Sequence, residues 1–302
     1  MTGLGALVRR NMKLYYQDKG LFLTSLITPV ILLVLFVTFL SGVYENVYRD
    51  AIAQIGIPIT DEAIRACVGG QLVSSLLAVS CVTVSFCSNL TSIQDKISGA
   101  RQDLTITPVK PGTLALSYFL ATLLSSLAVC LSGLLICLGY LAVTGWYLSA
   151  ADVAGLVGDV VLLVLFGTAL SACITFPLST QGQSSAVGTI VSSGYGFLCG
   201  AYMPIAQFSS GLRAFISHLP GTCGTVLTRQ HALGGALAEL ERQGLPAQAV
   251  EAIADSVDCR LFFGDKAVST PVLYLILLGT ILVLLGIYVC LNVFTLRKKA
   301  AR

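Results

Sequence analysis

Charged side chains are scarce in this chain. Only 11% of its 302 residues are charged, 55% are hydrophobic, and the mean hydropathy is +0.85. A soluble domain carries about 25% charged residues, because its surface has to face water. The composition therefore excludes an ordinary soluble protein and predicts an all-α integral membrane protein, with a single transmembrane domain over residues 1–302.

Sequence signatures of catalysis and metal binding are missing as well. The chain has no G-x-x-x-x-G-K-[ST] phosphate-binding loop, no G-x-S-x-G and no H-E-x-x-H. Its ten cysteines show no C-x-x-C spacing, and neither His218 nor His231 stands at metal-ligand spacing. We expect no enzyme active site, no metal and no cofactor in this chain.

Long apolar runs are what the chain has instead. Six segments can cross about 30 Å of hydrocarbon at about 1.5 Å per residue. They lie near residues 21–41, 64–90, 113–145, 154–176, 184–206 and 271–294. The sequence therefore predicts six transmembrane helices.

The distribution of Lys and Arg predicts the orientation. With both termini inside, the cytoplasmic segments hold eleven basic residues and the rest of the chain holds seven. Cytoplasmic loops carry the excess of Lys and Arg, so this arrangement is favoured. The net charge of +3 is thus a topology signal, and we expect no nucleic-acid partner. The expected location is the cell membrane, as a multi-pass protein of a prokaryotic plasma membrane in contact with lipid.

Residues 1–20 precede the first span and have helical periodicity. Apolar and basic side chains fall on different sides: Leu4, Leu7, Val8, Met12 and Tyr15 against Arg9, Arg10 and Lys13. This pattern is typical of an interfacial connecting helix on the inner leaflet. An ordinary basic flank that holds topology explains the same residues, and the sequence leaves both interpretations open.

Residues 205–270 form an unusually long outer segment before the last span. Helix-like stretches occupy 208–219, 222–241 and 247–258, and the first is apolar enough to dip into the bilayer edge. Loops of this length without function are uncommon. Cys223 and Cys259 both lie here and could form a disulfide in an oxidising exterior, or remain two unpaired thiols.

Polar residues inside the spans have two interpretations. Asp159 could be part of a proton relay, but its position near the outer end of its span favours a side chain that reaches the headgroups. Six small or aromatic polar residues could line a translocation path or serve as interhelical hydrogen-bond partners. They are Ser74, Ser75, Thr83, Ser192, Ser193 and Tyr195. A GxxxG at Gly196–Gly200 would allow close approach of another helix.

The segment QDKISGARQDLTITPVKPG at 94–112 stands between the second and third spans. Ile97, Ala100, Arg101 and Leu104 share one helical stripe, and Pro108 ends the helix because a residue before proline is pushed from the α region. We predict a short amphipathic helix fixed closely to two transmembrane helices. A force on such a helix reaches both spans.

This segment resembles a motif of ABC-2 type transporter permeases, which has a charged start, a central glycine and a Leu-x-x-[ST]-Pro ending. Here Asp95, Lys96, Gly99, Leu104 and Thr107-Pro108 match, while Ala100 stands where the family often has Thr or Ser. Gly200-Ala-Tyr-Met-Pro204, Leu219-Pro220 and Arg229 are similar to a second family pattern. Together with the six predicted spans, the resemblance covers the whole chain.

The resemblance implies the permease subunit of an exporter with the type V architecture. A separate ATPase subunit would bind ATP and Mg²⁺ and would hold residues 94–108 as a coupling helix. The coupling residues carried over are Asp95, Lys96, Gly99, Arg101, Leu104 and Pro108. A second permease chain, identical or different, would complete the transporter, and 205–270 would form re-entrant helices and a lid. The alternative is a secondary transporter driven by protons or sodium, which would need buried titratable groups.

Overall fold

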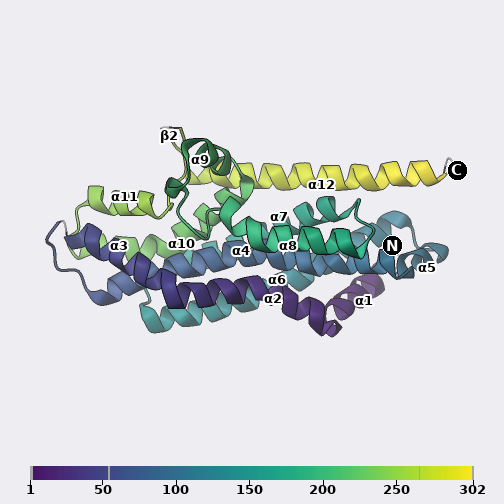
Figure 1. The fold of residues 1–302 in the computed structure, drawn as a ribbon, viewed down its shortest axis with the longest axis horizontal. Coiled ribbons are helices and arrows are strands. Elements are labelled where there is room, and N and C mark those ends of the chain that lie inside the picture. The colour runs from purple at the N-terminus through teal and green to yellow at the C-terminus, as the bar shows by residue number, and fades with distance from the viewer. Residues whose placement is uncertain (1–2, 54, 265, 301–302) are drawn as a thin grey trace.

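A computed structural model describes residues 3–53, 55–264 and 266–300, without the side chains of residues 51 and 294–300. The basic flank of the last span, Arg297, Lys298, Lys299 and Arg302, therefore lies outside the described side chains. The fold is almost entirely helical (Figure 1), as the composition predicts.

The helices follow one another in this order: α1 Leu4–Gln17, α2 Lys19–Leu35, a π-helical turn Phe36–Leu40, α3 Ser41–Ala53, α4 Asp61–Ile97, α5 Ala100–Ile106, α6 Pro111–Thr144, α7 Ala150–Thr175, α8 Gln181–Leu198, a 3-10 turn Ile205–Gln207, α9 Ser210–Ser217, α10 Pro220–Arg242, α11 Ala247–Ser256 and α12 Thr270–Ala300. A small antiparallel hairpin, β1 Phe262–Phe263 and β2 Lys266–Ala267, precedes α12 and was not expected from the sequence.

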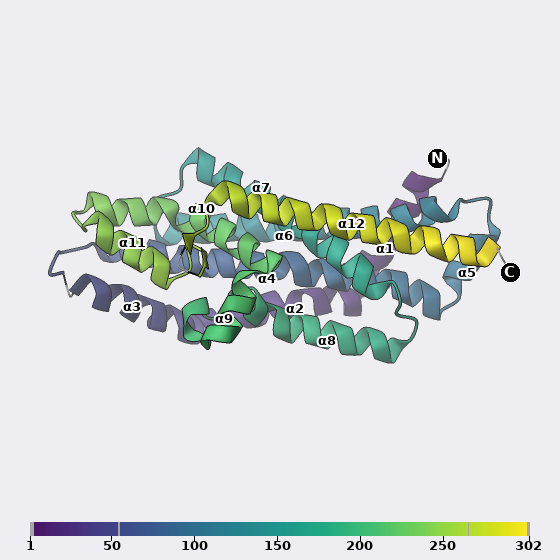
Figure 2. The same cartoon turned by 90° about the horizontal axis from the view of Figure 1, so that it is seen from above.

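The molecule is elongated, and its two ends differ (Figures 1 and 2). α1, α5 and the C-terminal part of α12 lie at one end, named here the α5 end. α3, α10 and α11 lie at the other, the α11 end. The first helix and the last turns of α12 thus lie at the same end of the bundle.

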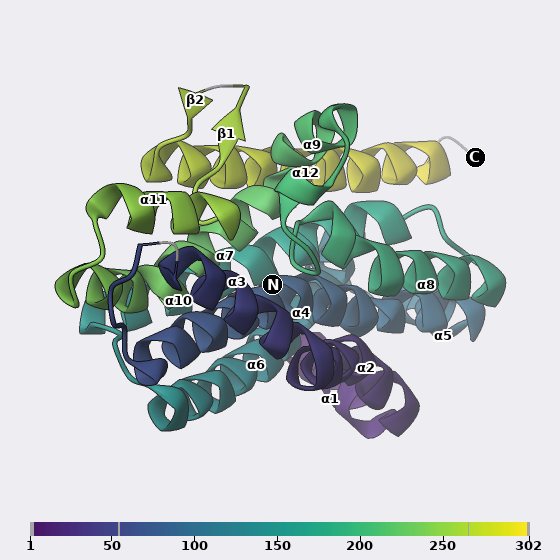
Figure 3. The ribbon, with the colours of Figure 1, turned by 60° about the vertical axis from the view of Figure 1, so that its left-hand side comes forward.

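α4 is the central helix of the bundle. It packs against α2, α6, α7, α8 and α10, and α12 and α2 lie on opposite sides of it (Figure 3). Its many small residues permit this, because backbones approach closely where side chains are small. At Gly70 an added Cβ would lie 2.6 Å from the carbonyl oxygen of Ala232 on α10.

Among the described residues, five helices are long and apolar enough to cross a membrane. They are Lys19–Asp50, Asp61–Ile97, Pro111–Thr144, Ala150–Thr175 and Thr270–Val293. These correspond to five of the six predicted spans. α8 covers most of the remaining one; its 18 residues are about 27 Å long, but Gln, Ser and Gly make it too polar to qualify.

The segment 205–270 contains the three predicted helices, and the first two differ in how they pack. α9 keeps Leu212 and Phe215 exposed, whereas α10 is the embedded helix and packs against α4, α7 and α12. Gly, Thr and Ala make this possible, because they let α10 enter the bundle closely.

The GxxxG at Gly196–Gly200 does not receive another helix within the described chain. The ring of Tyr202 occupies the space at Gly196, and Gly200 has φ +69 in the turn that follows α8. The amides of Ala201 and Tyr202 donate to the Gly196 carbonyl and close that turn. Gly200 therefore ends α8, because glycine adopts the positive φ of this turn without steric cost.

Candidate functional site

The predicted coupling segment is a helix end, a turn and a short helix at the α5 end. α5 ends at Ile106 before Pro108, as predicted, but the single predicted helix is divided: α4 continues through Ile97, and Gly99 turns the chain with φ +83. Ile97 therefore does not share a helix with Ala100, Arg101 and Leu104, because glycine permits the positive φ. Pro111 does not act as a further breaker. It is the first residue of α6, where proline's fixed φ and missing N–H suit the helix.

Asp95 lies at the root of this segment and is buried, with 5% of its surface exposed. Arg10 of α1 donates to both carboxylate oxygens, at 2.6 and 3.1 Å, and the Tyr118 hydroxyl of α6 donates to Asp95 Oδ2. The carboxylate therefore joins α1, α4 and α6. Both carboxylate oxygens are thus hydrogen-bonded within the chain, and a role of Asp95 in coupling stays a prediction.

Lys96 points to the other side of the same root. Its Nζ donates to three carbonyl oxygens beyond or at the end of α7, those of Thr175, Phe176 and Leu178, at 3.3, 2.8 and 2.9 Å. Helix C-termini leave carbonyls without intrahelical partners, and a cation there is favourable. Lys96 thus fastens the coupling segment to the α7–α8 connection.

The tip of the segment projects from the bundle. Leu104 packs with Leu7, Leu114 and Tyr118, and Arg101 is half-buried. Ile106 is 84% exposed, and Pro108 is also exposed. Of the six predicted coupling residues, Asp95 and Lys96 are therefore held at the root by hydrogen bonds, and Pro108 is exposed at a mostly polar tip.

A cleft of about 900 Å³ opens between α2 and α8, above α4. Its α2 wall is apolar, with Ile27, Ile31 and Leu35, and its α8 wall is polar, with Ser185, Thr189, Ser192 and Ser193. Such a cleft, apolar with a few convergent hydroxyls, is suited to an amphipathic small molecule.

Two of the six predicted path residues, Ser192 and Ser193, line this cleft. Ser74, Ser75 and Thr83 do not: they are buried inside α4's contacts, and Ser74 and Thr83 donate to carbonyls of their own helix. Tyr195 turns to α10, where an added Cβ at Gly221 would lie 2.7 Å from its hydroxyl oxygen. Ser74, Ser75 and Thr83 are enclosed because other helices surround α4, and Tyr195 of α8 faces α10 instead of the cleft. A translocation path along these four residues stays a prediction.

Arg229 of α10 has no exposed surface and lies inside the α11 half of the bundle. Its Nη2 donates to the carbonyl oxygen of Gly200 at 2.6 Å, and Nη1 lies 3.3 Å from Asp258 Oδ2. When the Gln71 side-chain amide is oriented with its oxygen toward Arg229, that oxygen accepts from Arg229 Nε at 3.2 Å and from Nη2 at 3.3 Å. Arg229 thus connects α4, α10 and the turn after α8.

Asp258 completes this buried site. Its Oδ2 also accepts from the amide of Ile205 at 2.7 Å, so one carboxylate holds both α10 and the turn at 200–205. Burial raises the pKa of the Asp258 carboxyl, although Arg229 and the Ile205 amide oppose this. The two halves of the second family pattern, Gly200–Pro204 and Arg229, therefore meet in space. Sequence analysis missed Asp258 because other acids lie close to it.

Asp159 differs from the favoured interpretation, because it does not reach the headgroups. It is 1% exposed, and it accepts from Tyr274 of α12 at 2.8 Å and lies 2.7 Å from His231 Nδ1 of α10. Gly155, one turn earlier on α7, leaves the room that the His231 ring fills. Three helices meet at this carboxylate.

Cys223 and Cys259 are both free thiols, so the structure does not form the predicted disulfide. Cys223 packs beside Leu273 and Leu277, whereas Cys259 packs in another cluster with Tyr48 and Leu240. Burial raises the pKa of Cys223 to about 11 and that of Cys259 to about 12. Such buried thiols behave as small apolar side chains.

Within the part of the chain that the structure describes, His, Cys, Asp and Glu do not gather in groups of three that could hold a metal. A search of curated proteins gives no match. The sequence profile of the ABC-2 type transporter family matches residues 2–230, which covers α1 through about the first half of α10. With its multiple apolar helices, the chain is an integral multi-pass membrane protein and a transport permease of the ABC type, and it belongs to the ABC-2 type transporter family.

Proposed function

We propose that the chain is the membrane subunit of an exporter whose ATPase is a separate protein that holds α5. The observation that carries this proposal is the construction of the α5 end. A rigid root, fixed by Asp95 and Lys96, bears a tip with Ile106 84% exposed. A short helix that projects from the bundle on a rigid root offers a partner protein a surface to bind.

Movement of this tip would reach much of the bundle. Asp95 ties the root to α1 and α6, and Lys96 ties it to the end of α7 and so to the start of α8. A load on α5 is therefore shared by helices on both sides of α4. ATP and Mg²⁺ would be bound by the partner, and this chain would transmit the change without catalysis of its own.

The cleft between α2 and α8 supports the transport path. It is open at the side of the bundle, and its two walls come from helices that both pack on α4. A second permease chain, the same or a sibling, would close it into a shared path. Export is the direction that the resemblance of the coupling segment implies.

The α5 end faces the cytoplasm in this proposal. The basic residues Arg9, Lys13, Lys19, Arg101 and Lys110 belong to this end, and positive charge marks the inner side. The membrane would be the plasma membrane of a prokaryote. The alternative of a proton- or sodium-driven transporter loses ground, because the family is of the ABC type and Asp159 is held by His231 and Tyr274.

Co-purification with an ATPase subunit encoded by a neighbouring gene tests the proposal. Ile106→Asp places a charge on the exposed tip and should lower the yield of complex at least about tenfold, because a docked carboxylate would lose its hydration. Ile55→Asp makes the same change on an exposed residue of the α11 end and should leave the yield unchanged. Equal yields of complex from I106D and wild type would contradict the proposal that the ATPase binds α5.

A further inference from the structure

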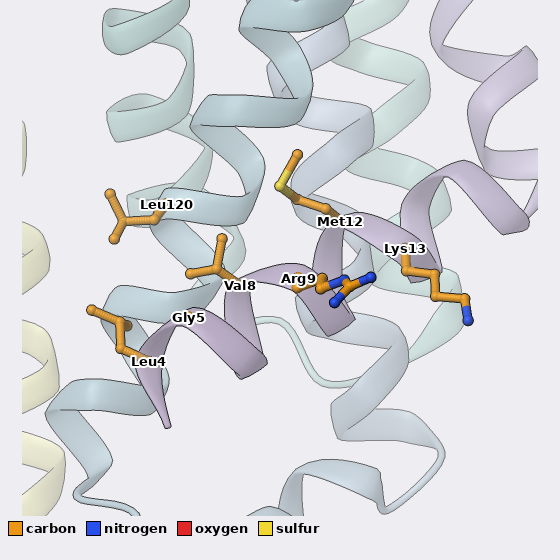
Figure 4. A pocket seen from close by; sticks show the side chains of 7 residues that line it. All are labelled: Leu4, Gly5, Val8, Arg9, Met12, Lys13 and Leu120. Carbon is orange, nitrogen blue, oxygen red and sulfur yellow. The ribbon is translucent and has the colours of Figure 1, made fainter. Parts of the chain in front are cut away.

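A hollow of about 600 Å³ lies where α1 crosses α6 at the α5 end (Figure 4). Its floor is apolar and consists of Leu4, Gly5, Val8, Met12 and Leu120. The α1 side chains follow one another at helical spacing and are half-buried, next to the stripe of α1 that packs into the bundle. The floor is therefore an accessible apolar strip beside the buried face of α1.

Two cations stand at the rim of this hollow. Arg9 and Lys13 lie one turn apart on α1, and both are exposed (Figure 4). Arg10, between them, is engaged by Asp95 at 2.6 Å. Within the described residues no acidic side chain is paired with Arg9 or Lys13, so this rim is positive and unneutralised.

Contacts between α1 and α6 indicate where the hollow lies relative to the membrane. The Tyr16 hydroxyl donates to the Ser125 carbonyl at 3.2 Å, and the exposed Tyr16 ring lies beside Phe22, as aromatic side chains do at a membrane boundary. From Ser125 to the end of α6 is about 29 Å, close to the hydrocarbon thickness. Leu120 lies about 7 Å further out, at the depth of lipid headgroups.

We propose that this hollow binds one anionic phospholipid. The upper methylenes of an acyl chain lie along Val8, Met12 and Leu120, and the phosphate lies between Arg9 and Lys13. Apolar floor and paired cations at headgroup depth match the two parts of such a lipid. Because Arg10 joins the same helix to Asp95, the bound lipid holds α1 against the root of α5. This inference does not depend on an ATPase.

Lipid retention by the purified chain tests the charge of the site. The chain is equilibrated in micelles with equimolar phosphatidylglycerol and phosphatidylcholine, and retained lipid is counted by native mass spectrometry. Wild type should retain phosphatidylglycerol preferentially. Arg9→Gln with Lys13→Gln should lower this preference by about fivefold for each cation removed.

The matched control is Lys19→Gln with Lys110→Gln, which removes the same charge from exposed residues of the same end. It should keep the preference of wild type. Equal loss in both double variants, or no preference in wild type, overturns the proposal. A further outcome is that R9Q/K13Q keeps the lipid preference of wild type and loses the ATPase subunit. That result would assign the surface to a protein partner and would also overturn the lipid proposal.

A second pair of variants tests the floor without touching charge. Gly5→Leu fills the hollow from an exposed helical position with open space at its Cβ, so the fold tolerates it. It should reduce retained phosphatidylglycerol several-fold. Gly112→Leu has equally open space but lies outside the hollow, and it should have no effect. Full retention by G5L excludes an acyl chain on this floor.

Discussion

Arg229 and Asp258 form a buried ion pair, with Nη1 and Oδ2 3.3 Å apart, although 29 residues separate them. The guanidinium has no exposed surface and the Asp258 side chain has 8%. Charges removed from water in this way are costly unless each remaining donor finds an acceptor. Gly200, Ser75 and Gln71 supply those acceptors, so the pair fixes where α10 meets the turn after α8.

Removal of Asp258 should destabilise the chain strongly. Asp258→Ala leaves the Arg229 charge buried and unpaired, which costs about 3–5 kcal/mol. It also places alanine at φ +54, a conformation that Asn and Asp tolerate better. Asp258→Asn should therefore lose less stability than D258A in thermal unfolding in detergent micelles.

Arg242→Ala is the control, because Arg242 lies on the same helix as Arg229 but has 77% of its side chain exposed. Exposed pairs such as Arg242 with Glu239 contribute little. The unfolding temperature of R242A should be close to that of wild type. If D258A also unfolds at the temperature of wild type, the buried pair does not hold α10 in place.

The contact between His231 and Asp159 should make stability depend on pH. The hydrogen bond to Asp159 raises the pKa of His231 above its ordinary value of 6.5, and Asp152 acts in the same direction. The folded chain therefore holds this proton more tightly than the unfolded one. The stabilisation is complete below about pH 6.5 and is lost as the pH rises through the folded-state pKa.

Thermal unfolding of wild type and His231→Gln over a pH series measures this effect. The unfolding temperature of wild type should fall above about pH 6.5 relative to that of H231Q. His218→Gln, which replaces an exposed histidine, should keep the pH dependence of wild type. A difference between wild type and H231Q that grows with pH in favour of wild type would reverse the sign and refute the argument.

Lys96 should matter for the connection between α7 and α8. Lys96→Met keeps much of the side-chain volume but removes the charged donor from three carbonyl oxygens. Hydrogen bonds to a charged group contribute about 1.5–3 kcal/mol, so we expect a loss near 2 kcal/mol. Hydrogen exchange at residues 176–184 should become faster in K96M, and Lys110→Met, on an exposed residue, should change neither quantity.

The sequence predicted the main helices because each long apolar run has only one way to satisfy its backbone in lipid. The end of α5 before Pro108 was also predicted, since proline acts locally, whereas the break at Gly99, which separates Ile97 from the rest of the predicted stripe, was not. The role of Asp95 was not, because its partner Arg10 lies 85 residues away. A motif shows which residues recur, but not which of them face inward.

Long-range polar contacts were equally hidden. Asp159 has its two partners on α10 and α12, and no spacing along the chain connects them. A signal for the embedded helix did exist: the first half of α10 is rich in Gly and Thr, which is typical of close packing inside a membrane bundle. The stretch 208–219 is more apolar than α10, and its composition therefore predicted that stretch, not α10, at the bilayer edge.

Adjacent glycines on α10 offer the last prediction, since Gly234 and Gly235 differ only in their surroundings. An added Cβ at Gly235 would strike the Tyr147 carbonyl, a backbone group that cannot rotate aside, whereas at Gly234 the nearest atom is Asp152 Oδ1 at 3.9 Å. Gly235→Ala should lose about 1–3 kcal/mol through overpacking. Gly234→Ala should gain up to about 1 kcal/mol, because alanine favours the helix. Thermal unfolding of both variants measures the difference, and equal unfolding temperatures would mean that α10 does not lie against the α6–α7 loop.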